Sequence, residues 1–155
     1  MFRRTLTAAV CLLAAAALAR GQEGSLRFEK MVPFQRDQVI PLGARVGPVR
    51  VANVRFGLGS AGGVKGAILS RVHGGDSDVT SIVRASFDTE NPKAEEWNVT
   101  YTLELLDTNG KLIDRATRTG SFEGEASTFE LEHSTLSYVV PLIARVRVRL
   151  EASLD

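Results

Sequence analysis

The sequence predicts an all-β fold, an antiparallel two-layer β-sandwich with about eight strands. Apolar residues occupy every second position over 97–105, and the same alternation returns over 140–150. A period of two is typical of strands that bury one face in a core. After residue 19 no apolar series has helical spacing, and clusters of Gly, Pro, Asn and Asp interrupt the chain at short intervals, as they do between the strands of a sandwich.

The beginning of the chain has the layout of a secretory signal peptide. A basic start at Arg3 and Arg4 is followed by an apolar run over 8–19, which ends on small residues. We therefore expect cleavage after Ala19, a single β-sandwich domain over 20–155, and export to the periplasm or the extracellular space. A membrane span needs about 20 apolar residues, so we expect none in the mature chain.

Two alternatives for this segment are an uncleaved anchor and a lipoprotein signal ending at Cys11, which Val10 precedes where a small residue is usual. Cleavage after Ala19 would remove the only cysteine, and with it any disulfide or thiolate site. The mature chain would carry 17 basic and 18 acidic residues, a net charge of −1. This balance argues against a general nucleic-acid binder.

Charge is unevenly distributed along the chain. Residues 36–71 include six basic side chains and one acidic, whereas residues 76–132 include 13 acidic and five basic. We favour the interpretation that strands from the two parts lie near each other and pair their exposed faces. The alternative is a charged docking surface.

The first strands are interrupted by proline. We expect a short strand over 26–33 and an irregular or edge segment from Pro33 to Pro41, because proline has no N–H for a strand ladder. A longer strand is expected after Pro48. Its alternation changes parity at residues 52–53, which predicts a β-bulge there.

The middle of the chain alternates turns and strands. The glycine-rich stretch 57–63 is interpreted as a hairpin connection rather than a phosphate-binding loop, because Lys65 precedes glycine and no helix follows. Residues 67–73 form a weak predicted strand, and residues 79–88 a clearer one. The Asn91–Pro dipeptide ends that strand with a turn.

The strand that begins at Trp97 leads into a hairpin. Residues 107–110 read as its loop, in which Gly110 supplies a positive φ and the Asp107 carboxylate caps the turn. The return strand over 111–119 carries charges on both faces, which is typical of an edge strand. A further turn and a strand containing Phe129 precede the final alternating strand.

Two motifs in this region resemble FxLYD-type domains of exported bacterial proteins, and the likeness covers about residues 79–152. Leu103-Glu104-Leu105-Leu106-Asp107, followed by Gly110, is similar to the Phe-x-Leu-Tyr-Asp motif, with leucine in place of Phe and Tyr. Residues 124–129 resemble the family's Gly-Glu-x-x-x-Phe stretch. The resemblance implies an immunoglobulin- or fibronectin-like sandwich without catalytic residues.

The residue types that perform catalysis or bind metals are few. His73 and His133 end predicted strands without an identifiable second ligand, whereas a metal site needs three or four. Asp76 and Asp78 offer oxygen ligands for calcium, but such residues also form turns without a metal. No Gly-x-Ser-x-Gly elbow is present. We expect no catalytic residue, metal or cofactor.

Arg145, Arg147 and Arg149 form a row on one face of the last predicted strand, spaced about 7 Å apart. A guanidinium is a planar fork of donors suited to carboxylate or phosphate, so the row is a candidate site for anionic ligands. The alternative is that the row lies over acidic residues of adjacent strands. The acidic candidates are Glu104, Glu130 and Glu132.

These observations favour a non-catalytic module for protein–protein interaction or envelope assembly, whose partner is another envelope or extracellular protein. The edge strand over 111–119 offers backbone groups to which a partner strand can add. One alternative is a small metal-dependent or hydrolytic enzyme with loop-borne residues, which requires the histidines and aspartates named above to converge. The other is a binder of anionic ligands through the arginine row.

Overall fold

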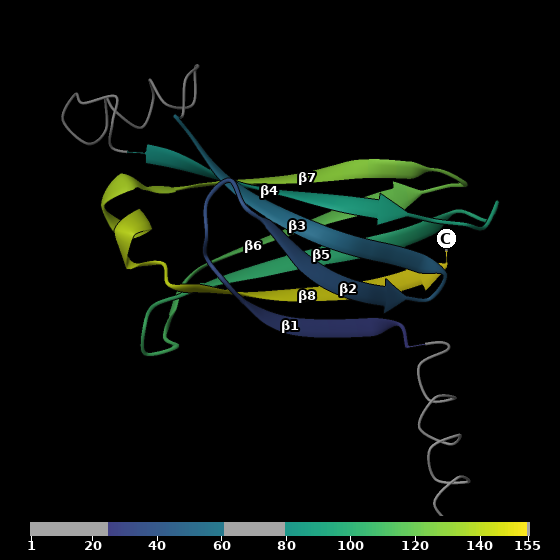
Figure 1. Cartoon of the computed structure of the whole chain (residues 1–155), viewed down its shortest axis with the longest axis horizontal. Helices are drawn as coiled ribbons and strands as arrows, with labels where there is room; N and C mark the ends of the chain where they lie inside the picture. The colour runs from purple at the N-terminus through teal and green to yellow at the C-terminus, as the bar shows by residue number, and fades with distance from the viewer. Residues whose placement is uncertain (1–24, 61–79, 155) are drawn as a thin grey trace, which may run out of the picture.

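The computed structural model describes residues 25–60 and 80–154, which form two antiparallel four-stranded sheets packed face to face (Figure 1). Sheet I has the order β1-β8-β5-β6, with bounds Arg27–Pro33, Arg145–Leu154, Trp97–Leu106 and Leu112–Phe122. Sheet II has the order β2-β3-β4-β7, with bounds Val39–Val46, Val49–Ser60, Thr80–Glu90 and Ala126–Leu136. The predicted all-β, two-layer sandwich is confirmed.

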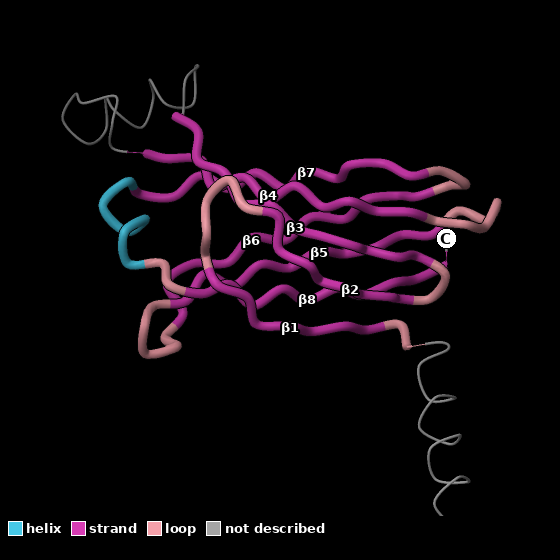
Figure 2. Tube along the Cα trace, in the orientation of Figure 1, coloured by secondary structure: helices cyan, strands magenta, loops and turns pink. Residues whose placement is uncertain are grey.

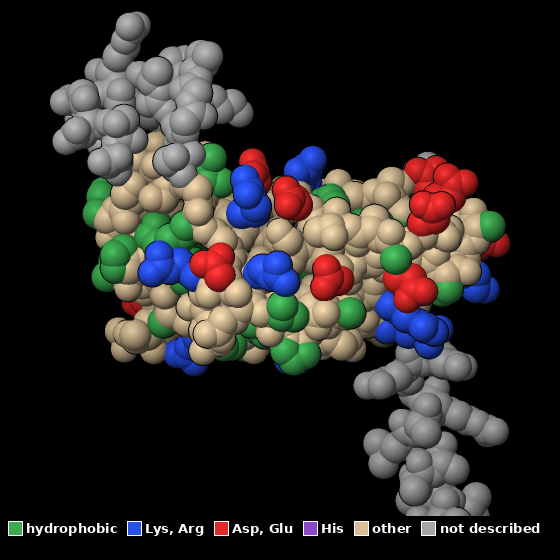
Figure 3. All heavy atoms as spheres, turned by 45° about the horizontal axis from the view of Figure 1, so that its top comes forward, with side chains coloured by type: hydrophobic (Ala, Val, Ile, Leu, Met, Phe, Trp, Pro, Cys, Tyr) green, Lys and Arg blue, Asp and Glu red, His purple; other side chains and the backbone are tan. Residues whose placement is uncertain are grey.

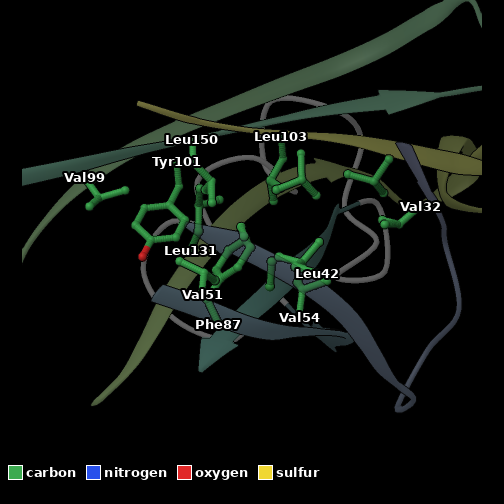
Figure 4. Close-up of a cluster of buried hydrophobic side chains, with 14 of the residues drawn as sticks. Val32, Leu42, Val51, Val54, Phe87, Val99, Tyr101, Leu103, Leu131 and Leu150 are labelled. Atoms are coloured by element: carbon green, nitrogen blue, oxygen red, sulfur yellow. The ribbon is translucent and has the colours of Figure 1, made fainter. Parts of the chain in front are cut away.

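The core fills the space between the sheets with residues from alternate positions. On β5, four alternating side chains are buried, as the sequence pattern predicts, and on β8 the valines and leucine of the second alternation join them. They are Val99, Tyr101, Leu103, Leu105, Val146, Val148 and Leu150. Phe87 of sheet II packs against Tyr101 with ring centroids 4.7 Å apart (Figure 4). The Tyr101 hydroxyl is satisfied inside the core by a 3.0 Å hydrogen bond with Thr89.

The strand order follows an interlocked pattern. β4 and β5 lie in opposite sheets, as do β7 and β8, and β4 pairs with β7 while β5 pairs with β8. Immunoglobulin domains pair two successive strands with two later ones in this way. The place beside β8, where such a domain carries its last strand, is taken here by β1 from the beginning of the chain.

Two local predictions are confirmed. The register of β3 against β4 shifts between Val51 and Asn53, which is the expected bulge. In the β5–β6 hairpin, the Asp107 carboxylate accepts the backbone N–H groups of Asn109 and Lys111, both at 2.8 Å, and Gly110 has φ of 81°. The bulge and the hairpin loop are each determined by a few neighbouring residues, so both can be predicted from the sequence.

The prediction of a strand over 140–150 is wrong at its beginning. Ser137–Leu142 form a short 3-10 helix, η1, and β8 begins only at Arg145 (Figure 2). The Ile143 N–H donates to the Val140 carbonyl and closes the last turn of this helix. Pro141 has no N–H to give to a ladder. The apolar alternation therefore starts before the strand does.

Three other expectations are refined. Residues 39–46 form an edge strand, β2, whose register against β3 shifts between Pro41 and Ala44. It includes Pro41, because an edge tolerates a missing donor. Gly57 and Gly59 lie in β3, paired with β4, rather than in a connection. The weak strand expected over 67–73 lies outside the described residues.

The two ends of the sandwich differ. Ser25 and Leu154 lie together at one end, where Gly47 donates to the Ser25 carbonyl and Leu154 stands opposite Trp97 in the sheet. The other end carries η1 and the β5–β6 hairpin loop (Figure 1). A partner that approaches the η1 end therefore does not meet Ser25 or Leu154.

Candidate functional site

A row of alternating charges crosses the outer face of sheet I. Glu104 on β5 accepts hydrogen bonds from Arg115 on β6 at 2.5 Å and from Arg147 on β8 at 2.8 Å. Glu29 on β1 accepts from Arg149 at 3.0 Å, and its other oxygen lies 3.5 Å from Nε of Arg147. We call these five residues the charge ladder. It joins all four strands, because the register places Glu104 opposite both Arg115 and Arg147.

The carboxylate of Glu104 is buried although it lies on the outer face, and the residue is only 5% exposed. Burial raises its pKa, but the hydrogen bonds and charges of Arg115 and Arg147 outweigh burial, so the pKa of Glu104 lies below its ordinary value. The ladder thus holds an ionised carboxylate between two cations. The sequence places Glu104 on the correct face but does not reveal its burial.

The predicted arginine row is divided between two roles. Arg147 and Arg149 belong to the charge ladder, where Glu29 and Glu104 neutralise them. Arg145 instead donates to the backbone carbonyl of Thr108 at 2.8 Å. An anionic ligand on this face would have to displace carboxylates that already occupy the guanidinium forks.

Of the three acidic candidates weighed as partners for this row, only Glu104 reaches it. Glu130 and Glu132 lie on β7 in sheet II, where Arg84 pairs with Glu132 at 2.7 Å. Both members of that pair lie in the acidic part of the chain, residues 76–132, so the pair does not join the basic part to it. Three arginines of the basic part have no such partner. In the part of the chain that the structure describes, the side chains of Arg45, Arg50 and Arg55 make no ion pair.

His133 is engaged with an aspartate. Its Nε2 lies 2.7 Å from Oδ2 of Asp114 on β6, and Thr135 donates to the same oxygen at 3.2 Å. Burial raises the pKa of Asp114, but these hydrogen bonds and that of the Arg115 N–H outweigh it, so the net direction is downward. These hydrogen bonds of Asp114 connect β6 of sheet I to β7 of sheet II.

No metal centre forms among residues 25–60 and 80–154, where no three His, Cys, Asp or Glu side chains come close enough to share an ion. His73, Asp76 and Asp78, which the enzyme alternative requires, lie outside the described residues.

The sheet edges carry cations that reach across to the other sheet. β6 is an edge strand, as predicted. Arg118 on β6 donates to the Glu130 carbonyl of β7 at 2.8 Å and covers the Phe129 ring at 5.5 Å. On the opposite side, Lys30 of β1 donates to the Pro41 carbonyl of β2 at 2.9 Å. Such cations discourage addition of a further strand, so contact through side chains is favoured over strand addition at β6.

The η1 end exposes apolar side chains. Tyr138 is 70% exposed, Leu142 is 56% exposed, and Leu112 at the start of β6 is 45% exposed. We call these three residues the apolar end. No residue of η1 is buried, and hydrophobic side chains gather at this end of the molecule in the surface view (Figure 3). The sequence analysis missed this surface, because it assigned Leu142 to a strand with one face in the core; Pro141 was the signal against that strand.

No protein-family model matches the chain, and no curated protein matches it. Among the described residues, no helix is long and apolar enough to cross a membrane. The resemblance to FxLYD-type domains therefore stays an expectation from the two motifs.

Proposed function

We propose that the chain is a non-catalytic exported module that binds another envelope or extracellular protein through the apolar end. The observation that carries this proposal is the exposure of Tyr138 and Leu142 on a short helix that projects beyond the sheets. Aromatic and long aliphatic side chains supply most of the binding energy at protein interfaces. A contiguous apolar surface on a soluble domain commonly marks an interaction site.

The charges around the apolar end support a protein partner. Two aspartates of the β5–β6 hairpin already have partners within the domain: Asp107 caps the hairpin loop, and Asp114 binds His133 and Thr135. Desolvation of an unpaired carboxylate would oppose association, and these carboxylates already have partners. A partner that covers the apolar end therefore need not desolvate an unpaired carboxylate at Asp107 or Asp114.

The position of the apolar end also supports this role. η1 lies at the end opposite Ser25 and Leu154, so a partner can approach without displacing β1 or β8 (Figure 1). Two other surfaces offer a partner less. The arginines of the charge ladder are already paired with carboxylates, and the β6 and β2 edges are covered by Arg118 and Lys30.

A capture experiment with matched variants tests the proposal. The mature chain is immobilised and exposed to the exported proteins of its native source, and the retained proteins are quantified. The double variant Tyr138→Ser/Leu142→Ser should lose at least about nine-tenths of a specific partner, which corresponds to about 1.4 kcal/mol or more of binding energy. The control is Leu154→Ser, because Leu154 is 60% exposed and lies at the other end.

The outcomes are distinct. A partner retained by the wild type and by Leu154→Ser but not by the double variant supports the proposal. Equal retention by all three proteins contradicts it, as does retention of nothing above background. Because all three substitutions are at exposed positions, each variant should unfold within about 0.5 kcal/mol of the wild type, which excludes misfolding as the cause.

A further inference from the structure

A hollow of about 450 Å³ lies at the end of the sandwich opposite η1, around the only tryptophan of the chain. Three segments meet there: the turn between β2 and β3, the loop between β4 and β5, and the residue before β1. The lining residues are Leu26, Arg45, Gly47, Pro48, Lys93, Glu95 and Trp97. No part of this hollow belongs to the apolar end or to the charge ladder.

The indole that forms one wall is held in place. Trp97 begins β5 and stands between Phe122 of β6 and Leu154 of β8 in the sheet register. Gly47 packs directly on the ring: a Cβ there would come within 2.7 Å of Cζ3, and its φ of 56° also favours glycine. The half-buried indole of Trp97 is therefore in place before any ligand arrives.

The charged side chains that line the hollow do not form ion pairs with one another. The side chains of Arg45 and Lys93 are exposed and make no ion pair or hydrogen bond to any residue in 25–60 or 80–154, and neither does the Glu95 carboxylate. The loop that carries Lys93 and Glu95 is hydrogen-bonded to the side chain of buried Asn91. Asn91 donates to the Glu95 carbonyl at 2.9 Å and accepts the Lys93 N–H at 3.0 Å.

A second hollow, on sheet I, differs from the Trp97 hollow because its arginines already have carboxylate partners. It is lined by two arginines and two glutamates, but Arg149 pairs with Glu29 at 3.0 Å and Arg27 pairs with Glu151 at 3.4 Å. An anion entering that hollow must compete with resident carboxylates. An anion entering the Trp97 hollow meets Arg45 and Lys93 without such competition.

We propose that the Trp97 hollow binds an acidic saccharide, a sugar ring that carries a carboxylate. The C–H face of the ring would pack on the indole of Trp97, which is flat and apolar. The carboxylate would bind the guanidinium fork of Arg45 and the ammonium of Lys93. Glu95 would accept hydrogen bonds from ring hydroxyls, which a peptide of glutamates lacks.

Fluorescence of Trp97 provides a direct readout, because no other tryptophan is present. The mature chain is titrated with a trisaccharide of galacturonic acid, with the corresponding neutral trisaccharide of galactose, and with pentaglutamate. Isothermal titration calorimetry gives the dissociation constants independently. We expect saturable binding of the acidic trisaccharide, at least tenfold weaker binding of the neutral one, and no binding of the peptide.

Matched variants locate the site. Arg45→Gln should weaken binding of the acidic trisaccharide about tenfold, whereas Arg55→Gln should leave it unchanged. Arg55 is a suitable control because it is an exposed arginine of the same β2–β3 hairpin that does not line the hollow. The proposal is overturned if the acidic trisaccharide does not bind, if pentaglutamate or the neutral sugar binds as tightly, or if the two variants behave alike.

Discussion

Substitution of Glu104 by glutamine tests whether the charge ladder stabilises sheet I. The change keeps the shape of the side chain and removes its negative charge. One amide oxygen can still accept a hydrogen bond from one arginine, but the amide NH₂ then faces the donors of the other. The variant therefore loses one charge-assisted hydrogen bond and weakens the second, with little change in packing.

The size of the effect follows from the burial of the three groups. Glu104 is nearly inaccessible, while Arg115 and Arg147 keep 55% and 34% of their side-chain surface exposed and can regain water when released. A hydrogen bond to a charged group contributes about 1.5–3 kcal/mol, so we expect Glu104→Gln to cost about 2 kcal/mol. For a domain of this size that is a decrease in Tm of about 6–10 °C.

The effect should depend on pH with a definite sign. The pKa of Glu104 is lower in the folded state, so its ion pairs stabilise the fold above the unfolded-state pKa of about 4.3. This contribution is lost progressively as the pH falls below that value and through the folded-state pKa. The difference in unfolding free energy between wild type and Glu104→Gln should therefore shrink on acidification.

Urea unfolding followed by circular dichroism measures this difference at pH 7 and near pH 3. Glu123→Gln is the control, because Glu123 is exposed in the β6–β7 turn and makes no ion pair in the described structure. A cost of less than about 0.5 kcal/mol at neutral pH, within the range of ordinary surface substitutions, would refute the reasoning. So would an equal cost at both pH values.

Three further predictions concern the Trp97 end, and urea unfolding measures each of them. Trp97→Ala should lower the free energy of unfolding by about 1–3 kcal/mol, less than for a fully buried tryptophan, because the ring is only half-buried. Trp97→Phe should lower it clearly less than Trp97→Ala does, since the buried indole N–H has no partner to lose in the described structure. A cost for Trp97→Ala below about 0.5 kcal/mol would contradict the packing of its ring on Gly47. Asn91→Ala should cost about 3 kcal/mol, because it leaves the buried Phe122 carbonyl and the loop groups unpaired; a neutral result would show that water replaces the amide. Gly47→Ala should cost about 1–3 kcal/mol through its positive φ and the contact with the indole, and equal stability would mean that the turn can move away from the ring.

The sequence predicts those features that are encoded within one segment. The alternation of β5, the bulge at residues 52–53 and the Asp107-capped hairpin each depend on neighbours in the chain, so pattern and turn chemistry suffice. The beginning of β8 was misassigned for the same reason. Apolar residues continue the strand alternation into η1, and only Pro141 and the tertiary structure distinguish the two.

Features that combine distant segments could not be predicted in this way. Glu104 is buried because strand register places Arg115 and Arg147 on either side of it, although Arg147 is 43 residues away. The Trp97 hollow likewise combines a β-turn, a loop and the lead-in to β1. The sequence indicates that arginines could bind an anionic ligand, but it does not reveal which arginines already have carboxylate partners.

Site-specific photo-crosslinking tests the role of the apolar end most directly. A photoreactive amino acid replaces Tyr138 in one variant and Leu154 in the other, and both are illuminated in the native compartment. The account predicts a covalent adduct with a particular exported protein at position 138 and none with that protein at position 154. Adducts of equal yield at both positions, or no adduct at position 138, would contradict it.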